Sequence, residues 1–131
     1  MSDKKQVLTA NSEFYLAFLE RDFDRMDGIW SRREDVTVIH PGYSLLHGRA
    51  TVLESWRQVL SSVHSPEIHC CNASAYINDS FAYVVCHETL ANSTLIATNI
   101  FTLEDDSWKL IHHQAGPAPD LLDESPAGKP H

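Results

Sequence analysis

The sequence predicts an α+β fold in which helices occupy the chain before residue 65 and a four-stranded antiparallel meander follows. Two patterns indicate this fold class. Apolar residues recur at helical spacing in the first half of the chain, whereas extended runs separated by turn residues follow Pro66. Because 131 residues provide for one hydrophobic core, we expect a single domain.

Three helices are expected before residue 65. The first covers residues 7–21, where the residues of one amphipathic stripe recur at i, i+3, i+4 and i+7. A second, shorter helix follows Asp22 and has Asp24 in its first turn, where a negative charge suits the helix dipole. The third covers residues 48–62. Its apolar side consists of Val52, Leu53, Trp56, Val59 and Leu60.

The strands are separated by clear turn signals. Residues 35–40 are rich in β-branched side chains, and Pro41 and Gly42 form a turn before residues 43–46, which predicts a short hairpin. Longer strands are predicted at residues 68–77, 81–90, 93–103 and 108–115. We assign residues 1–117 to one domain and residues 118–131, which lack periodicity, to a flexible tail.

The composition argues against several classes of partner. Eighteen acidic and ten basic residues give a net charge of -8, which disfavours nucleic acid and anionic membranes. No apolar run approaches the ~20 residues that cross a bilayer, and the N-terminus has no signal-peptide pattern. Three cysteines indicate no disulfide framework. We therefore expect a cytoplasmic protein.

Three segments, residues 35–42, 48–56 and 108–113, carry the most specific family signal. With the order of the elements, they resemble the nuclear transport factor 2-like superfamily, or cystatin-like cone, and especially its SnoaL-like branch. The resemblance covers residues 7 to 117. It implies a cone-shaped curved antiparallel sheet that wraps around the long N-terminal helix and leaves a cavity for a small hydrophobic molecule.

The same resemblance implies a homodimer formed across the outer face of the sheet. The residues expected on this face in the strand at 93–103 are Ile96, Thr98, Ile100 and Thr102. Such a row is too apolar for a fully solvated surface. We therefore expect a second copy of the chain to cover it.

A more distant resemblance to ketosteroid isomerase implies a catalytic site. His40 stands directly before Pro41, where that enzyme has its catalytic aspartate. Tyr15 and Asn99 fall where it has its two oxyanion donors. A neutral imidazole suits proton abstraction near neutral pH, and hydroxyl and amide groups can donate to an oxyanion. The alternative to a catalytic role for His40 is a strand-end histidine bonded to a backbone carbonyl. The alternative for Tyr15 is a core tyrosine whose hydroxyl has one buried partner.

Further residues are expected to bind the substrate. In the strand at 81–90, the resemblance turns Val85 and His87 inward and leaves Cys86 and Glu88 outward. The remaining candidates for the walls and mouth of the cavity are Phe18, Trp30, Val38, Trp56 and Phe101. The two tryptophans lie on helical apolar stripes and are core residues that can also line the mouth.

The last predicted strand contains adjacent histidines, which must point to opposite faces. Alternation from Lys109 places His112 inside, whereas alignment through Gly116 places His113 inside. Converging imidazoles would suit zinc or iron, but no histidine pair with a carboxylate stands on one element. We therefore expect no metal and no cofactor.

Two functional hypotheses follow from these residues. The first is an acid–base isomerase, cyclase or dehydratase acting on a hydrophobic carbonyl metabolite, with His40 as base and Tyr15 and Asn99 as donors. The second is a non-catalytic homodimeric module for ligand binding or association. The fold hosts both classes, so the site must decide between them.

Overall fold

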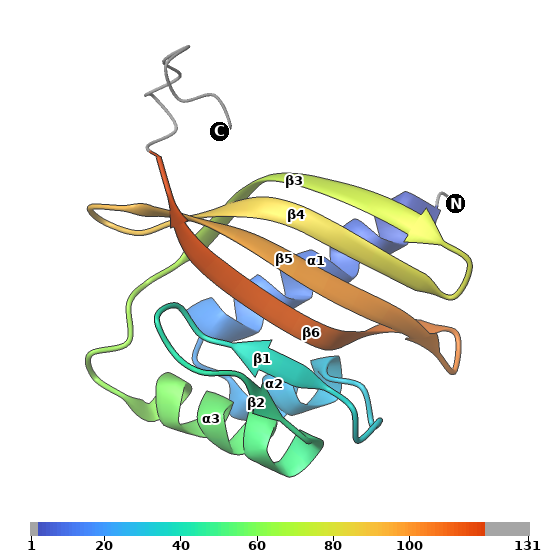
Figure 1. The fold of residues 1–131 in the computed structure, drawn as a ribbon, viewed down its shortest axis with the longest axis horizontal. Coiled ribbons are helices and arrows are strands. Elements are labelled where there is room, and N and C mark those ends of the chain that lie inside the picture. The colour runs from blue at the N-terminus through green and yellow to red at the C-terminus, as the bar shows by residue number, and fades with distance from the viewer. Residues whose placement is uncertain (1–2, 120–131) are drawn as a thin grey trace.

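The computed structural model describes residues 3–119, whose three helices and six strands form an α+β cone (Figure 1). The helices are α1 (Asp3–Leu19), α2 (Phe23–Ile29) and α3 (Arg49–Ser61). The strands are β1 (Thr37–Ile39), β2 (Leu46–His47), β3 (His69–Asn78), β4 (Phe81–Thr89), β5 (Thr94–Glu104) and β6 (Ser107–Ala118). The predicted fold class is confirmed. Of the predicted tail, Ala118 ends β6, and residues 120–131 lie outside the described residues.

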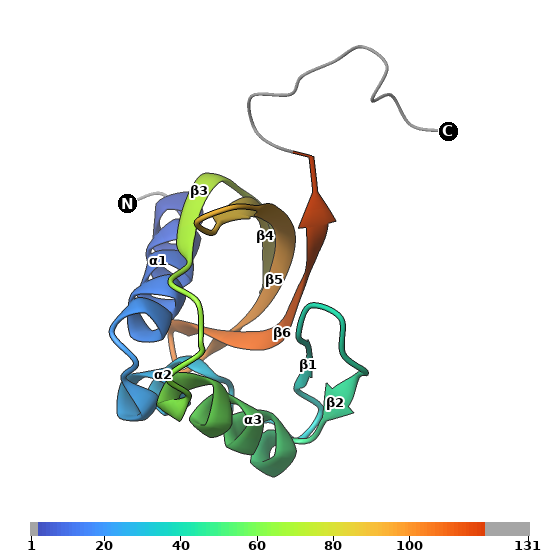
Figure 2. The ribbon, with the colours of Figure 1, turned by 90° about the vertical axis from the view of Figure 1, so that its left-hand side faces the viewer.

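The six strands form one sheet in the order β2-β1-β6-β5-β4-β3. Strands β3 to β6 pair antiparallel in succession, which confirms the predicted meander. The expected hairpin of β1 and β2 is also present, but β1 runs parallel to β6, so the sheet is mixed. Figure 2 shows the strong curvature of β3 to β6, with α1 along one side and α3 below.

The helix boundaries follow from local chemistry. The Asp22 carboxylate accepts a hydrogen bond from the Arg25 backbone N–H at 3.1 Å, which satisfies one of the free donors at the start of α2. Gly48 precedes α3 with a φ of +94°, a conformation that residues with a Cβ rarely adopt. The three predicted helices are confirmed, although α1 begins at Asp3, before its apolar pattern starts.

Large aromatic side chains build the core between the sheet and the helices. Phe14, Trp56 and Phe101 are fully buried. The Trp56 ring makes edge contacts with the rings of Phe14 and Phe18, at centroid distances of 5.4 and 5.3 Å. These contacts fix α3 against α1. They therefore set the position of the side chains that α3 presents to the site.

The side chains of β4 that point inward are the opposite row from the one predicted. Cys86 and Glu88 point inward and are buried, whereas Val85 and His87 point to the outer face. The inner face of β4 contacts α1, which leaves room only for small side chains along most of the strand. The larger Tyr83 lies outside, 44% exposed. The resemblance to ketosteroid isomerase therefore indicated the wrong face of this strand.

Candidate functional site

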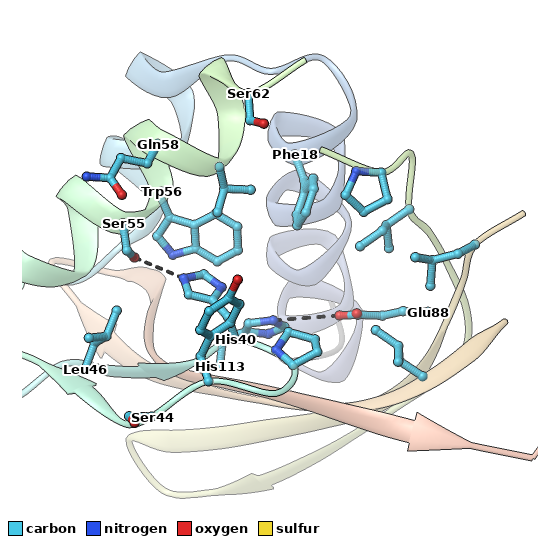
Figure 3. Close-up of a pocket in the computed structure, with 17 residues that line it drawn as sticks. Phe18, His40, Ser44, Leu46, Ser55, Trp56, Gln58, Ser62, Glu88 and His113 are labelled. Carbon is cyan, nitrogen blue, oxygen red and sulfur yellow. Dashed lines mark hydrogen bonds and ion pairs between the residues drawn. The ribbon is translucent and has the colours of Figure 1, made fainter. Parts of the chain in front are cut away.

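A cavity of about 730 Å³ opens between α3, the turn after β1 and the ends of β4 and β5 (Figure 3). This volume lies within the range of small-molecule sites. Its walls are mainly apolar, with Phe18, Trp56, Val59, Ile68 and Leu95 among the lining residues. Its histidine and carboxylic acid side chains are His40, Glu88 and His113. The cavity thus combines apolar binding surface with few ionisable groups.

His40 is held in one orientation at the end of β1. Its Nε2 lies 3.0 Å from the Ser55 hydroxyl of α3, and this hydroxyl donates its hydrogen to the Val52 carbonyl at 2.6 Å. The Ser55 oxygen must therefore accept from His40, which places the imidazole proton on Nε2 and the lone pair on Nδ1. Burial lowers the pKa of His40, so the imidazole is neutral at neutral pH.

The indole ring of Trp56 joins the two histidines of the cavity. It contacts the His40 ring at a centroid distance of 4.9 Å and the His113 ring at 5.8 Å. Figure 3 shows both imidazoles beside this indole. Trp56 lines the cavity and contacts two imidazoles that come from different parts of the chain.

Behind the cavity lies a buried hydrogen-bond network. The Tyr15 hydroxyl donates to Glu88 Oε2 at 2.5 Å. The Asn99 amide Nδ2 donates to Asn11 Oδ1 at 2.8 Å and to the Tyr15 oxygen at 3.1 Å. The Asn99 Oδ1 lies 2.5 Å from His113 Nδ1. The network links α1 to β4, β5 and β6, with Glu88 and His113 at its cavity end.

Tyr15 and Asn99 are brought together, but not as free donors in the cavity. Neither side chain lines it. The hydroxyl hydrogen of Tyr15 is directed to Glu88, and both amide hydrogens of Asn99 are directed to other side chains. The expectation that these two groups face a substrate oxyanion is therefore wrong. The register of β5 places Asn99 inward as expected, but α1 covers it.

Glu88 is the site residue that sequence reasoning missed. It is 2% exposed and lines the cavity. Burial raises the pKa of its carboxyl group, although the hydrogen bond from Tyr15 acts in the opposite direction. The usable signal was an acidic residue that continues the row of Val84 and Cys86 along the strand. With that row placed inside, Glu88 would have been a candidate.

His113 faces the cavity, whereas His112 does not. A register shift between Ile100 and Phe101 marks a β-bulge in the pairing of β5 with β6. His113 therefore points inward and is buried, and His112 bonds Thr37 Oγ1 through Nδ1 at 2.7 Å. Burial, together with the charges of His40 and His112, lowers the pKa of His113 to about 3.

The structure places the remaining candidates in three environments. Phe18 lines the cavity. Trp30, Val38 and Phe101 are buried in the core and do not line it. The expectation that Val85 and His87 face the cavity is wrong, because both lie on the outer face of β4.

Residues 3–119 contain neither a cluster of metal-ligating side chains nor a membrane-spanning helix. No group of three or more histidine, cysteine, aspartate or glutamate side chains in that range is arranged to hold a metal ion. Within the same residues, no helix has the length and apolarity needed to cross a membrane. The three cysteines, Cys70, Cys71 and Cys86, are free thiols.

The family model of the SnoaL-like domain matches residues 7–119. A solved structure from Streptomyces avermitilis, named a "putative dehydratase" from the NTF2-like family, has a TM-score of 0.81 and 28% identity. The match covers 90% of this chain and 97% of the Streptomyces chain.

Two other proteins are also similar to this chain. A Thiobacillus denitrificans structure, named a "putative calcium/calmodulin-dependent protein kinase type II association domain", has a TM-score of 0.76 and 27% identity, and the match covers 84% of this chain and 93% of that one. The F-box protein SKIP8 of Arabidopsis thaliana is 20% identical over 113 residues, which is 85% of this chain. The chain spans about half of that relative, 49% of its length.

Proposed function

The chain belongs to the SnoaL-like domain family, and from this premise we propose that it binds a small hydrophobic carbonyl compound and converts it by acid–base chemistry. The reaction class is that of an isomerase, cyclase or dehydratase. The observation that carries the proposal is the fixed imidazole of His40, whose Nε2 is bonded to Ser55 within an apolar cavity. The name of the Streptomyces avermitilis relative falls in the same reaction class.

His40 has the properties of a general base. Its lone pair is on Nδ1, for which the described residues offer no hydrogen-bond partner. Burial lowers its pKa, so the basic form persists at neutral pH. The apolar walls would bind the hydrophobic part of a substrate and exclude water from the reacting atoms. Proton transfer of this kind needs no metal or cofactor.

Filling the cavity is expected to abolish ligand binding. Val59 lines the cavity from α3, and Val59→Trp would place an indole in the space for ligand. A screen of hydrophobic hydroxy-ketones and enones by thermal shift should find compounds that stabilise the wild type. At 100 times the Kd, stabilisation should reach about 2.7 kcal/mol.

The matched control is Val63→Trp, because Val63 is 88% exposed and does not line the cavity. This variant should keep the ligand-induced shift. Equal shifts in both variants would show that the compounds bind elsewhere and would contradict the assignment of the cavity.

A second candidate function is a homodimeric association module. The observation that favours it is the exposed aromatic surface on the outer face of the sheet, where Tyr76 and Tyr83 stack at a centroid distance of 4.9 Å. Ile96 lies on the same face and is 44% exposed. The Thiobacillus denitrificans relative is named as an association domain. Dimerisation is compatible with catalysis in the cavity, because the two surfaces lie on opposite faces of the sheet.

We expect Tyr83→Asp to dissociate this dimer, because it would bury a charge at the centre of the contact. Light scattering at micromolar concentration should give about twice the chain mass of 14.8 kDa for the wild type and the single mass for the variant. Val63→Asp is the control for an added surface charge and should leave the dimer intact. A wild type of 14.8 kDa would refute the association proposal.

A further inference from the structure

Glu88 is an unusual buried acid because no lysine or arginine among the described residues neutralises it. Its side chain is 2% exposed, and its direct hydrogen-bond donor is the neutral hydroxyl of Tyr15. The nearest ionisable nitrogen is His113 Nε2, at 3.8 Å from Oε2. A carboxylate in such surroundings lacks the partner that a buried charge requires.

The hydrogen-bond network fixes the tautomer of His113. Asn99 donates through Nδ2 to Asn11 and to Tyr15, so its Oδ1 is the atom that faces His113 Nδ1 at 2.5 Å. This oxygen accepts, and Nδ1 must therefore carry the hydrogen. In the neutral imidazole, the lone pair is then on Nε2, which faces the Glu88 carboxyl group.

Two acceptors consequently face each other at the inner end of the cavity. The two atoms lie 3.8 Å apart, which is longer than a hydrogen bond, but a carboxylate oxygen and an imidazole lone pair still repel at this distance, and one additional proton on either group removes the repulsion. Burial raises the pKa of Glu88 and lowers that of His113 to about 3, so Glu88 is the group of the two that binds a proton more readily. Figure 3 shows Glu88 and His113 side by side in the cavity wall, with His40 beyond them.

We infer that Glu88 and His113 hold one transferable proton at neutral pH, and that this pair is the general acid of the site, opposed to the base His40. A site with one base and one acid suits the elimination of water from a hydrophobic β-hydroxy carbonyl compound. This inference rests on the proposed function, whose reaction class it narrows. The Glu88–His113 pair takes the place of the two oxyanion donors that were expected from the sequence, because Tyr15 and Asn99 have no free hydrogen to donate.

The elimination balances without any co-reactant. His40 Nδ1 takes the proton from the carbon next to the carbonyl, and the electrons of that C–H bond form the carbon–carbon double bond. The bond from the β-carbon to the hydroxyl oxygen breaks, and the Glu88–His113 pair protonates this oxygen, so that water leaves. His40 then carries one extra proton and the pair lacks one. Transfer between them through water restores the starting state.

The proton on the pair can be measured without a substrate. Infrared spectra of the whole protein at pH 7 should contain a protonated-carboxyl band that Glu88→Gln removes and the exposed control Glu54→Gln keeps. Nitrogen NMR of His113 should show a neutral ring with hydrogen on Nδ1. An ionised Glu88 with a doubly protonated His113 would also support the shared proton, with His113 as the donor. An ionised Glu88 beside a neutral His113 would overturn the inference.

Activity separates this inference from the proposed function. The glutamine of Glu88→Gln keeps an acceptor for Tyr15 and gains an amide donor for His113, so the fold should be retained. With a β-hydroxy ketone as substrate, kcat of this variant should fall by a factor of about 10² to 10⁴, which is the usual contribution of a general acid. Full activity in Glu88→Gln together with loss of activity in His40→Gln would overturn the assignment of the Glu88–His113 pair as the general acid. The same result would leave His40 as the general base. Full activity in both variants would contradict the proposed function itself.

Discussion

Replacing His40 by glutamine is expected to lower kcat by about 10² to 10⁴, which is the usual contribution of a positioned general base. Glutamine can still donate a hydrogen bond to Ser55, so the turn after β1 should keep its structure. It has no nitrogen lone pair at the position of Nδ1 and cannot accept a proton from carbon. Ligand affinity should change much less than kcat, because the apolar walls remain.

The control for this experiment is His64→Gln, which changes an exposed histidine in the loop after α3. Its kcat should equal that of the wild type. Thermal-shift binding measured on the same variants separates loss of binding from loss of chemistry. Unchanged turnover in His40→Gln would end the assignment of His40 as the base.

The pH dependence of the rate should also identify His40 as the base. Burial lowers the pKa of His40 below its ordinary value near 6.5, so the rate should rise with pH through a value below 6.5. In His40→Gln this acidic limb should disappear. If Glu88 supplies the proton, its raised pKa adds a second limb, and the rate falls as pH rises through it.

The second large effect is an acid-dependent loss of stability caused by His113. Its pKa is about 3 in the folded chain, against about 6.5 when unfolded. The unfolded chain therefore binds one more proton than the folded chain between these values, and the free energy of unfolding falls as pH falls through that window. This difference in the pKa of His113 between the folded and the unfolded chain corresponds to about 5 kcal/mol over the full range.

Urea unfolding of wild type and His113→Asn tests this linkage. The asparagine keeps an amide donor for Asn99 but does not titrate. Between pH 6 and pH 4, the wild type should lose about 1 kcal/mol per pH unit more than the variant. Glu88, His40 and His112 are the other titratable groups around this ring. Parallel stability curves for the two proteins would show that His113 is not buried as a neutral imidazole.

Helix and strand positions could be predicted because they depend on local patterns. Apolar residues at helical spacing place a helix wherever one side must be buried, and this gave α1 and α3 within a few residues. The alternation after Pro66, interrupted by turn residues, gave the four strands of the meander. The family resemblance supplied the curvature of the sheet and the position of His40 at the cavity.

Which face of a strand points inward could not be read from alternation alone. A shift of one residue exchanges the two faces completely. In β4, the contact with α1 selects the row of small side chains, and this turns Glu88 inward and His87 outward. In β6, the bulge opposite Ile100 and Phe101 selects His113 over His112.

The sequence by itself determined the fold class, the order of the elements and the presence of a histidine before Pro41 at a strand end. Only the tertiary structure decided the partners of the buried polar groups. Tyr15, Glu88 and His113 come from distant parts of the chain, and their roles depend on which donor meets which acceptor. That match is set by helix packing and strand register. For this reason, Tyr15 and Asn99 support a buried acid instead of facing the substrate.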